Sequence, residues 1–383
     1  MSDNEPSGWQ KSALVINSDE RITHIVSHQL SLFGWQTEEA TTIPQALELL
    51  NAKQWYLIFF SHTLRSEPAS PVERQLERLQ PNAHLFLLKG EHSENPTDSP
   101  VRDIFCELEL SAGDEQAGVS LLRKWLPVVE ERITELQDAV ELPIDTCSDS
   151  PIIGACPAMQ ETRRQLARLS GTREPCLITG EAGTGKLLVA RTLHELRHRE
   201  GEAMTLIMCE EENEKLSTGE RSLLSGVMKT DRRGTIHLTQ LETASDKLQS
   251  ALLDLDYGTG ASTSIIASSC RNLHEMVERG AFRAELYSRL KNYIYLPPLK
   301  DRREDIGLLL AHFVGRFINK PHVRVSQQAW KLLQEHAWEF NLPELHSVAL
   351  NAVASGAGAI CVMDIPFANE NNKPGVFPKN VKM

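Results

Sequence analysis

Two α/β blocks in succession, followed by a helical segment, are the fold that this 383-residue sequence predicts. In both blocks short apolar runs alternate with amphipathic stretches, which is typical of a doubly wound parallel sheet. The second block also holds a glycine-rich loop, GEAGTGK at 180–186, between an expected strand and an expected helix. From residue 306 onward the expected elements are helices.

The first block covers residues 1–126. Its apolar runs predict buried strands, and apolar side chains spaced by three and four residues predict helices between them. The expected strands are 13–16, 56–60 and 85–88, and the expected helices are 22–33 and 43–50.

Residues 121–140 are predicted to form one amphipathic helix, because their apolar side chains recur every three or four positions. These side chains are Leu122, Trp125, Val129, Ile133, Leu136 and Val140. Such a helix can pack on its own domain or pair with a second copy, and so short a repeat does not decide between the two. The polar stretch 143–151 is expected to be a linker.

The second block begins near residue 152 and follows the same alternation. Its expected strands are 176–179, 205–208, 235–238 and 264–267, with a helix at 186–197 after the first of them. The helices expected after this block are 306–317, 326–336 and 342–354.

Composition places the chain among soluble globular proteins, with 41% hydrophobic and 24% charged residues. No apolar run is long enough for a bilayer, and the polar start does not resemble a secretory signal. The seven cysteines form no CxxC pair, so reduced thiols in a cytoplasmic protein are expected. The net charge of −12 argues against a nucleic-acid-binding surface overall. The histidines show no metal-ligand spacing, and the basic run 300–303 is interpreted as solvated surface.

The glycine-rich loop has the residue types that phosphate binding needs. Glycines let backbone N–H groups turn towards phosphate oxygens, the helix that follows adds the partial charge of its N-terminus, and Lys186 adds a cation. Leu187 stands where a Ser or Thr would ligate Mg²⁺. The alternative is a glycine-rich turn without function. The expected nucleotide-binding residues are Gly180, Glu181, Ala182, Gly183, Thr184, Gly185, Lys186 and Leu187.

Several segments, in order and spacing, resemble one family. GEAGTGK with the following LLVARTLHELRHR is similar to GESGTGKELVARAIH of the AAA+ ATPases that activate the sigma-54 form of bacterial RNA polymerase, the NtrC-type regulators. Segments 281–292 (AFRAELYSRLKN) and 296–306 (LPPLKDRREDI) match further blocks of that family. The resemblance runs from 153 to 366 and implies an AAA+ P-loop α/β domain with a helical lid subdomain, which binds ATP or ADP.

The first block then resembles the receiver (CheY-like) domain that often precedes such an ATPase. The domains expected from this resemblance are a degenerate receiver-like domain at 1–126, a helical linker at 127–150, the AAA+ α/β subdomain at 151–305, the lid at 306–366 and a flexible tail at 367–383.

The receiver-like block has none of the acids of a working receiver. The acidic pair after the first strand is replaced by Asn17 and Ser18, and the phospho-accepting Asp after the third by Ser61. Lys89 stands where a Thr or Ser is expected. Asp19 lies nearby but could hold a metal only alone. The block is therefore expected to be a pseudo-receiver that is recognised by a protein partner, by a small ligand or by neither.

The AAA+ block departs from the family at the residues that support hydrolysis. Where relatives read GGTLFLDE, this chain reads RGTIHLTQ, so Thr239 replaces the Asp that holds Mg²⁺ and Gln240 replaces the Glu that polarises water. No catalytic residue is therefore expected, and Mg²⁺ binding is expected to be weak or absent. A misaligned strand is the alternative. Cys270 takes the place of a γ-phosphate-sensing Asn, and Pro343 that of an Arg in the family block WPGNVREL.

Two elements of family activators are not found in the sequence. The 25 residues at 210–234 are acidic at their start and contain no GAFTGA, the motif that touches sigma-54. The seventeen residues after 366 contain no helix-turn-helix for DNA. Direct DNA binding is therefore not expected.

Arg283 and Arg289 match the two arginines that, in relatives, reach a neighbour's nucleotide as arginine fingers. The alternative is a pair of ordinary surface or salt-bridging arginines beside Glu285 and Asp301. Arg191, on the helix after the phosphate loop, is expected to face the same region. Some relatives bind cyclic dinucleotides near there, and no second basic motif supports that here.

The functional hypothesis is a regulator-like protein that binds ATP or ADP, hydrolyses it poorly or not at all, and acts through self-association or through an active paralogue. A second hypothesis is a true ATPase whose acids come from elsewhere, such as Glu242 or Asp246. A third is a structural interaction module that does not bind nucleotide.

Overall fold

The structure, a computed structural model, describes residues 10–61, 75–76, 78–80, 82–89, 104–109, 115–144, 151–197, 202–209, 234–253, 263–318, 322–355 and 359–368. The chain divides into two compact units. The first is made of Met1–Thr146, Leu310–Glu335 and His346–Met383, and the second of Cys147–Leu309 and His336–Leu345.

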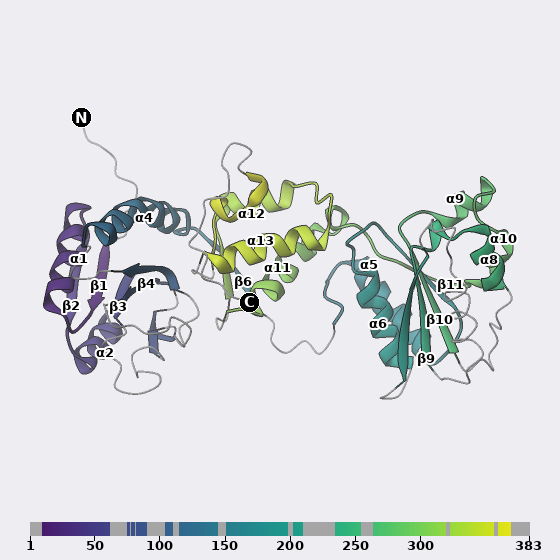
Figure 1. The fold of residues 1–383 in the computed structure, drawn as a ribbon, viewed down its shortest axis with the longest axis horizontal. Coiled ribbons are helices and arrows are strands. Elements are labelled where there is room, and N and C mark those ends of the chain that lie inside the picture. Colours follow the sequence, from purple (N-terminus) through teal and green to yellow (C-terminus); the bar gives the residue numbers. More distant parts are fainter. Residues whose placement is uncertain are drawn as a thin grey trace. The chain divides into compact units, whose positions relative to one another are not determined.

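The first unit begins with a five-stranded parallel sheet in the order β2-β1-β3-β4-β5, as expected for a doubly wound, receiver-like domain (Figure 1). Its strands are β1 (Ser12–Ile16), β2 (Gln36–Ala40), β3 (Leu57–Ser61), β4 (His84–Lys89) and β5 (Ile104–Glu109). Its helices are α1 (Glu20–Leu32), α2 (Ile43–Ala52) and α4 (Glu115–Glu135). The polar strand β2 was not predicted, because its sequence QTEEA has no apolar run; backbone pairing with β1 holds it at the edge.

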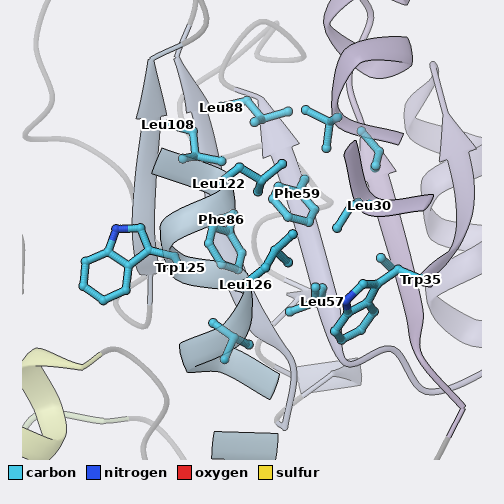
Figure 2. Packing of buried hydrophobic residues seen from close by; sticks show 14 of the residues in the cluster. Leu30, Trp35, Leu57, Phe59, Phe86, Leu88, Leu108, Leu122, Trp125 and Leu126 are labelled. Carbon is cyan, nitrogen blue, oxygen red and sulfur yellow. The ribbon is translucent and has the colours of Figure 1, made fainter. Parts of the chain in front are cut away.

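Alternate side chains of the central strands supply the cores on the two faces of this sheet. On one face, Phe59 and Phe86 stack with ring centroids 4.6 Å apart, between α1 and α4 (Figure 2). On the other face, Ile58 and Phe60 pack with α2. Each strand is thus buried on both sides, which explains its continuous apolar sequence.

Helix α4 packs on the sheet of its own domain. Its side chains Leu122, Trp125, Leu126, Val129 and Ile133 belong to the same buried cluster as Phe59 (Figure 2). Of the two arrangements that the spacing allowed, the structure therefore has the docked helix.

The helix expected over 121–140 is wrong at its end. Helix α4 ends at Glu135, and Val140 begins a strand, β6 (Val140–Pro143). This strand pairs antiparallel with β12 (His322–Val325), which pairs parallel with β13 (Ala359–Ile360). The apolar spacing continued past Glu135 because Val140 and Leu142 are apolar residues of the strand. The alternation of a strand of four residues is too short to be recognised in the sequence.

The helices after residue 305 agree with the expected ones to within two residues. They are α11 (Ile306–Gly315), α12 (Gln327–Glu335) and α13 (Leu342–Ala354), followed by the 3-10 turns η5 (Val362–Asp364) and η6 (Pro366–Ala368). Residues 369–383, most of the expected tail, lie outside the described residues.

The second unit holds another five-stranded parallel sheet, in the order β11-β7-β10-β9-β8. Its strands are β7 (Cys176–Thr179), β8 (Ala203–Met208), β9 (Gly234–Thr239), β10 (Thr263–Ser269) and β11 (Asn292–Tyr295). Helices α5 (Pro157–Ser170) and α6 (Lys186–Arg197) cover one face, and α8 (Asp246–Leu253), α9 (Leu273–Glu278) and α10 (Ala284–Arg289) lie on the other (Figure 1). The 3-10 turns η2 (Leu241–Thr243), η3 (Leu299–Asp301) and η4 (Arg303–Asp305) complete it.

A fully buried ion pair ties α4 to the three-stranded sheet of the first unit. Arg132 Nη1 lies 2.8 and 2.9 Å from the two carboxylate oxygens of Asp364, and both side chains are 0% exposed. Arg132 Nη2 donates to Ser355 Oγ and to the Ala359 carbonyl. Burial lowers the pKa of Arg132, but the neighbouring Asp364, Cys361 and Glu135 together outweigh it, and the net pKa shift is upward.

Replacing one partner of this pair leaves the other charge buried and uncompensated, which costs about 3–5 kcal/mol. We therefore expect Arg132→Met to lower the opening free energy of the β12 and β13 amides by that amount, measured by hydrogen exchange. Arg164→Met, at the exposed pair with Glu161, is the control and should change stability by less than about 1 kcal/mol. A change below 1 kcal/mol for Arg132→Met would contradict the role given to the pair.

A second prediction concerns His237, a fully buried histidine of β9 whose Nε2 lies 3.1 Å from Ser268 Oγ. Burial lowers the pKa of His237 to about 4. Between that value and an unfolded pKa of about 6.5 the unfolded state binds more protons, so stability falls as the pH falls through this window. At pH 5 the loss from this residue reaches about 2 kcal/mol. Wild type should lose unfolding free energy between pH 7.5 and pH 5, and His237→Phe should reduce that loss by about 2 kcal/mol. If the loss is the same in both proteins, the imidazole is not kept neutral in the folded state.

Candidate functional site: the phosphate loop and the strand ends beside it

The glycine-rich loop joins β7 to α6, as the sequence predicts. The four residues of β7 are all buried, and α6 begins at Lys186. The backbone of Gly180, Gly183 and Gly185 has φ values of 151°, 76° and 105°, in the region that side chains disfavour. These three glycines therefore give the loop a curvature that other residues would resist.

Two of the glycines also allow close approach of other backbone. A Cβ at Gly180 would lie 2.5 Å from the Leu296 carbonyl oxygen, and a Cβ at Gly183 would lie 2.5 Å from that of Phe340. Pro343 Cδ would be 3.0 Å from the same Gly183 Cβ. Pro343 thus packs against the loop at the position where relatives carry an arginine.

Lys186 turns back over the loop. Its Nζ donates to the carbonyl oxygens of Gly180 at 2.8 Å and Glu181 at 2.7 Å. The ammonium is therefore held inside the curve of the loop, at the N-terminal end of α6, where it can exchange a carbonyl for a phosphate oxygen. Cradle and cation together fit the phosphates of a nucleotide.

Asn341 holds the loop from outside. Its Oδ1 accepts from the Leu299 amide at 2.7 Å, and its Nδ2 donates to the Ala182 carbonyl at 2.9 Å and to Glu181 Oε2 at 3.2 Å. The residue is fully buried with φ at 56°, a conformation that Asn tolerates better than most residues. One side chain thus joins the loop to two later segments of the chain.

The Glu181 carboxylate is also paired with Lys300, whose Nζ lies 3.1 Å from Oε1. The hydrogen bonds from Lys300 and then Asn341 lower the pKa of Glu181, so this side chain is an anion bound by protein groups. The Glu181 carboxylate is therefore already engaged by Lys300 and Asn341.

The interpretation of 300–303 as solvated surface is wrong for Arg302. This side chain is 2% exposed, and its Nη2 donates to the Thr184 carbonyl at 3.2 Å. Asp305, also buried, accepts from the amides of Ala155 and Cys156 at 2.6 and 3.0 Å. Burial lowers the pKa of Arg302. The run is basic in sequence, yet one of its members supports the phosphate loop.

The residues expected to replace the catalytic acids lie at the end of β9. Thr239 Oγ1 donates to the Ile207 carbonyl of β8 at 3.3 Å. Gln240 is exposed and has a left-handed backbone, with φ at 53°. Glu242, two residues on, accepts from the Cys270 amide at 3.0 Å through Oε1. The sequence indicated Glu242 only as an alternative source of a catalytic acid. Its place two residues after Gln240 was the feature that could have drawn attention to it.

The three arginines lie on two helices: Arg191 is within α6, Arg283 directly precedes α10, and Arg289 is the last residue of α10. Arg283 and Arg191 are exposed. Arg289 is half-buried, and its Nη1 donates to the Leu253 carbonyl at 2.6 Å. The arginine-finger role stays a prediction.

In the receiver-like sheet, Asn17, Ser61 and Lys89 lie at or just after the carboxyl ends of the adjacent strands β1, β3 and β4. Asp19 is the N-cap of α1, because its carboxylate accepts from the amides of Arg21 and Ile22. Among the described residues no group of three or more His, Cys, Asp or Glu could hold a metal ion. Asp19 therefore has a structural role at the start of α1.

A parallel sheet with a phosphate-type loop after one strand defines this protein as a P-loop α/β protein. Two family models match it: "Sigma-54 interaction domain" over residues 153–299 and "AAA+ ATPase lid domain" over residues 300–379. None of the described helices is long and apolar enough to cross a membrane.

Known regulators resemble the chain over most of its length. It is 32% identical over 380 residues to the transcriptional regulatory protein ZraR of Salmonella typhi, and the aligned region covers 91% of this chain and 85% of that protein. It is 26% identical over 371 residues to the DNA-binding transcriptional regulator NtrC of Bradyrhizobium sp. (strain RP501 Parasponia), covering 90% and 76%. The crystal structure of NtrX from Brucella abortus in complex with ADP covers 95% of this chain and 87% of that one, at 20% identity and a TM-score of 0.47. The chain belongs to the NtrC-type, sigma-54-dependent AAA+ regulator family.

The contact between the phosphate loop and the 340–343 segment can be tested with two glycines. Gly183 and Gly280 have similar φ values, 76° and 72°, so Ala costs about 1–2 kcal/mol of backbone strain at either. Of the two glycines, Gly183 is the one where the added Cβ would also meet backbone, because no atom of the described residues lies within 4 Å of a Cβ at Gly280. Gly183→Ala should therefore lower the thermal unfolding midpoint more than Gly280→Ala. Equal shifts would contradict the contact.

Proposed function

We propose that this chain is a regulator that binds ATP or ADP at the phosphate loop and hydrolyses it poorly or not at all. The observation that carries the first part is the loop itself, with its three glycines in positive-φ backbone and Lys186 Nζ within its curve. Backbone amides, the start of α6 and one ammonium together provide an anion site for a diphosphate or triphosphate.

The side chains at the end of β9 support the second part. Phosphoryl transfer depends on charge stabilisation and on a positioned water. Thr239 and Gln240 carry no charge, and the Thr239 hydroxyl is engaged by the Ile207 carbonyl. Leu187, 40% exposed at the start of α6, offers no oxygen to a metal. With these three residues, the site would still bind a nucleotide but would not support its cleavage.

The regulatory part of the proposal rests on family membership and on sequence. The segment between β8 and β9 contains no GAFTGA, so a direct contact with sigma-54 through that motif is not proposed. Assembly with copies of this chain or with an active paralogue is proposed instead. Arg283, exposed just before α10, and Arg289 would reach a neighbour's nucleotide in such an assembly.

A second function, an ATPase with a displaced acid, is favoured by one observation. The Glu242 carboxylate lies at the ends of β9 and β10, bonded to the Cys270 amide. Phosphate release from purified protein distinguishes the two functions, because steady turnover that Lys186→Ala abolishes would establish the ATPase.

Lys186→Ala tests the binding proposal. Charge-assisted hydrogen bonds are worth about 1.5–3 kcal/mol, so the variant should bind ATP and ADP at least about tenfold more weakly than wild type. Isothermal titration calorimetry measures the affinities, and Lys291→Ala, an exposed lysine before β11, is the matched control. If wild type binds neither nucleotide and its melting temperature is unchanged in ATP, the chain is a structural interaction module, because a ligand of the native state must raise stability.

A further inference from the structure

The carboxyl ends of β7, β10 and β9 lie side by side, because β10 is between the other two in the sheet. The register fixes their levels: Ser269 of β10 pairs with Thr179 of β7, and Ala267 of β10 pairs with Leu238 of β9. The residue after β10, Cys270, is therefore level with Gly180, the first residue of the phosphate loop. Adjacent strands are about 5 Å apart.

Glu242 is placed at this edge by a hydrogen bond. The left-handed turn at Gln240 redirects the chain after β9, and in the η2 turn that follows, the Oε1 atom of Glu242 accepts from the Cys270 amide at 3.0 Å. The carboxylate thus lies over the end of the strand that adjoins the phosphate loop. It also helps to raise the pKa of Cys209, after the desolvation that is the main cause, so its charge is felt at the end of β8 as well.

Among the described residues, the second carboxylate oxygen of Glu242, Oε2, is buried and accepts no hydrogen bond. A buried carboxylate oxygen without a donor is costly, and the cost is relieved by a cation. The orphaned atom fits a hard divalent cation such as Mg²⁺, which prefers oxygen ligands and usually keeps several of its waters.

The other acids near this edge do not fit that place. Glu181 is paired with Lys300 and Asn341. Asp246 is exposed in the first turn of α8. At the end of β9 itself, Thr239 and Gln240 are uncharged. Among the described residues that directly follow β7, β9 and β10, Glu242 is the carboxylate left to face a cation.

We infer that Glu242 is the metal-facing carboxylate of the nucleotide site, contacting the Mg²⁺ of a bound nucleoside triphosphate directly or through one of its waters. This inference rests on the proposed nucleotide binding and revises the expectation that Mg²⁺ binding is weak or absent. Without Mg²⁺ the Glu242 charge opposes the terminal phosphate of ATP, whereas with Mg²⁺ it attracts the complex. ADP, which has no γ-phosphate, is less sensitive to Glu242.

The test is calorimetric binding of ATP and of ADP to the full chain, each in MgCl₂ and in EDTA, for wild type and Glu242→Gln. The amide keeps the oxygen that accepts from Cys270 and removes only the charge. Wild type should bind ATP more tightly in MgCl₂ than in EDTA. In Glu242→Gln, Mg-ATP should bind about tenfold more weakly, while ATP in EDTA should bind equally or more tightly. Removing the exposed charge in Asp246→Asn should leave all four affinities unchanged.

Each other outcome overturns the inference in a recognisable way. If Glu242→Gln keeps the wild-type gain from Mg²⁺, or if wild type shows no gain, Glu242 does not face the metal, while nucleotide binding itself stands. If Asp246→Asn loses the gain instead, the metal-facing acid is Asp246. ADP affinity in EDTA shows whether the Glu242→Gln site is intact. If wild type binds neither nucleotide, the proposed function fails together with the inference.

Discussion

Burial of the parallel strands on both faces is the constraint on which the candidate sites depend. The residues of β7 and most of those of β10 are inaccessible, so neither strand can offer a polar group to a ligand along its length. Polar chemistry is thereby confined to the carboxyl ends, where loops leave the sheet. The phosphate loop, Glu242 and Cys270 all lie at such ends.

The phosphate loop keeps its shape through groups that are distant in sequence. Asn341 holds the Ala182 carbonyl, Arg302 holds that of Thr184, and the Leu342 amide donates to that of Gly183 at 3.2 Å. These bonds hold the backbone of the loop in one conformation. On the proposed function, the loop is therefore an anion site that is formed before the ligand arrives, which lowers the ordering cost of binding.

Retained and changed positions of the AAA+ site differ in what they contribute. The retained ones, the glycines and Lys186, are those that would bind phosphate through the shape of the backbone and one cation. The changed ones are positions 187, 239 and 240, where Leu187, Thr239 and Gln240 replace residues whose oxygens and charges would act on a metal or on water. A carboxylate from the next turn, Glu242, restores a charge near that place without restoring the position of either acid. On the proposed function, this chain keeps the residues that bind phosphate and has changed those that support cleavage.

The sequence by itself determined the two α/β blocks, the phosphate loop and helices such as 186–197 and 342–354, because continuous apolar runs, helical spacing and glycine punctuation are local signals. It could not determine the end of α4, the strand β6 or the polar strand β2, since these depend on partners far along the chain. Nor could it show that Arg302 is buried beneath the loop or that Glu242 bonds to the Cys270 amide. Those facts follow from the order and register of the strands, and only tertiary structure sets which strand ends become neighbours.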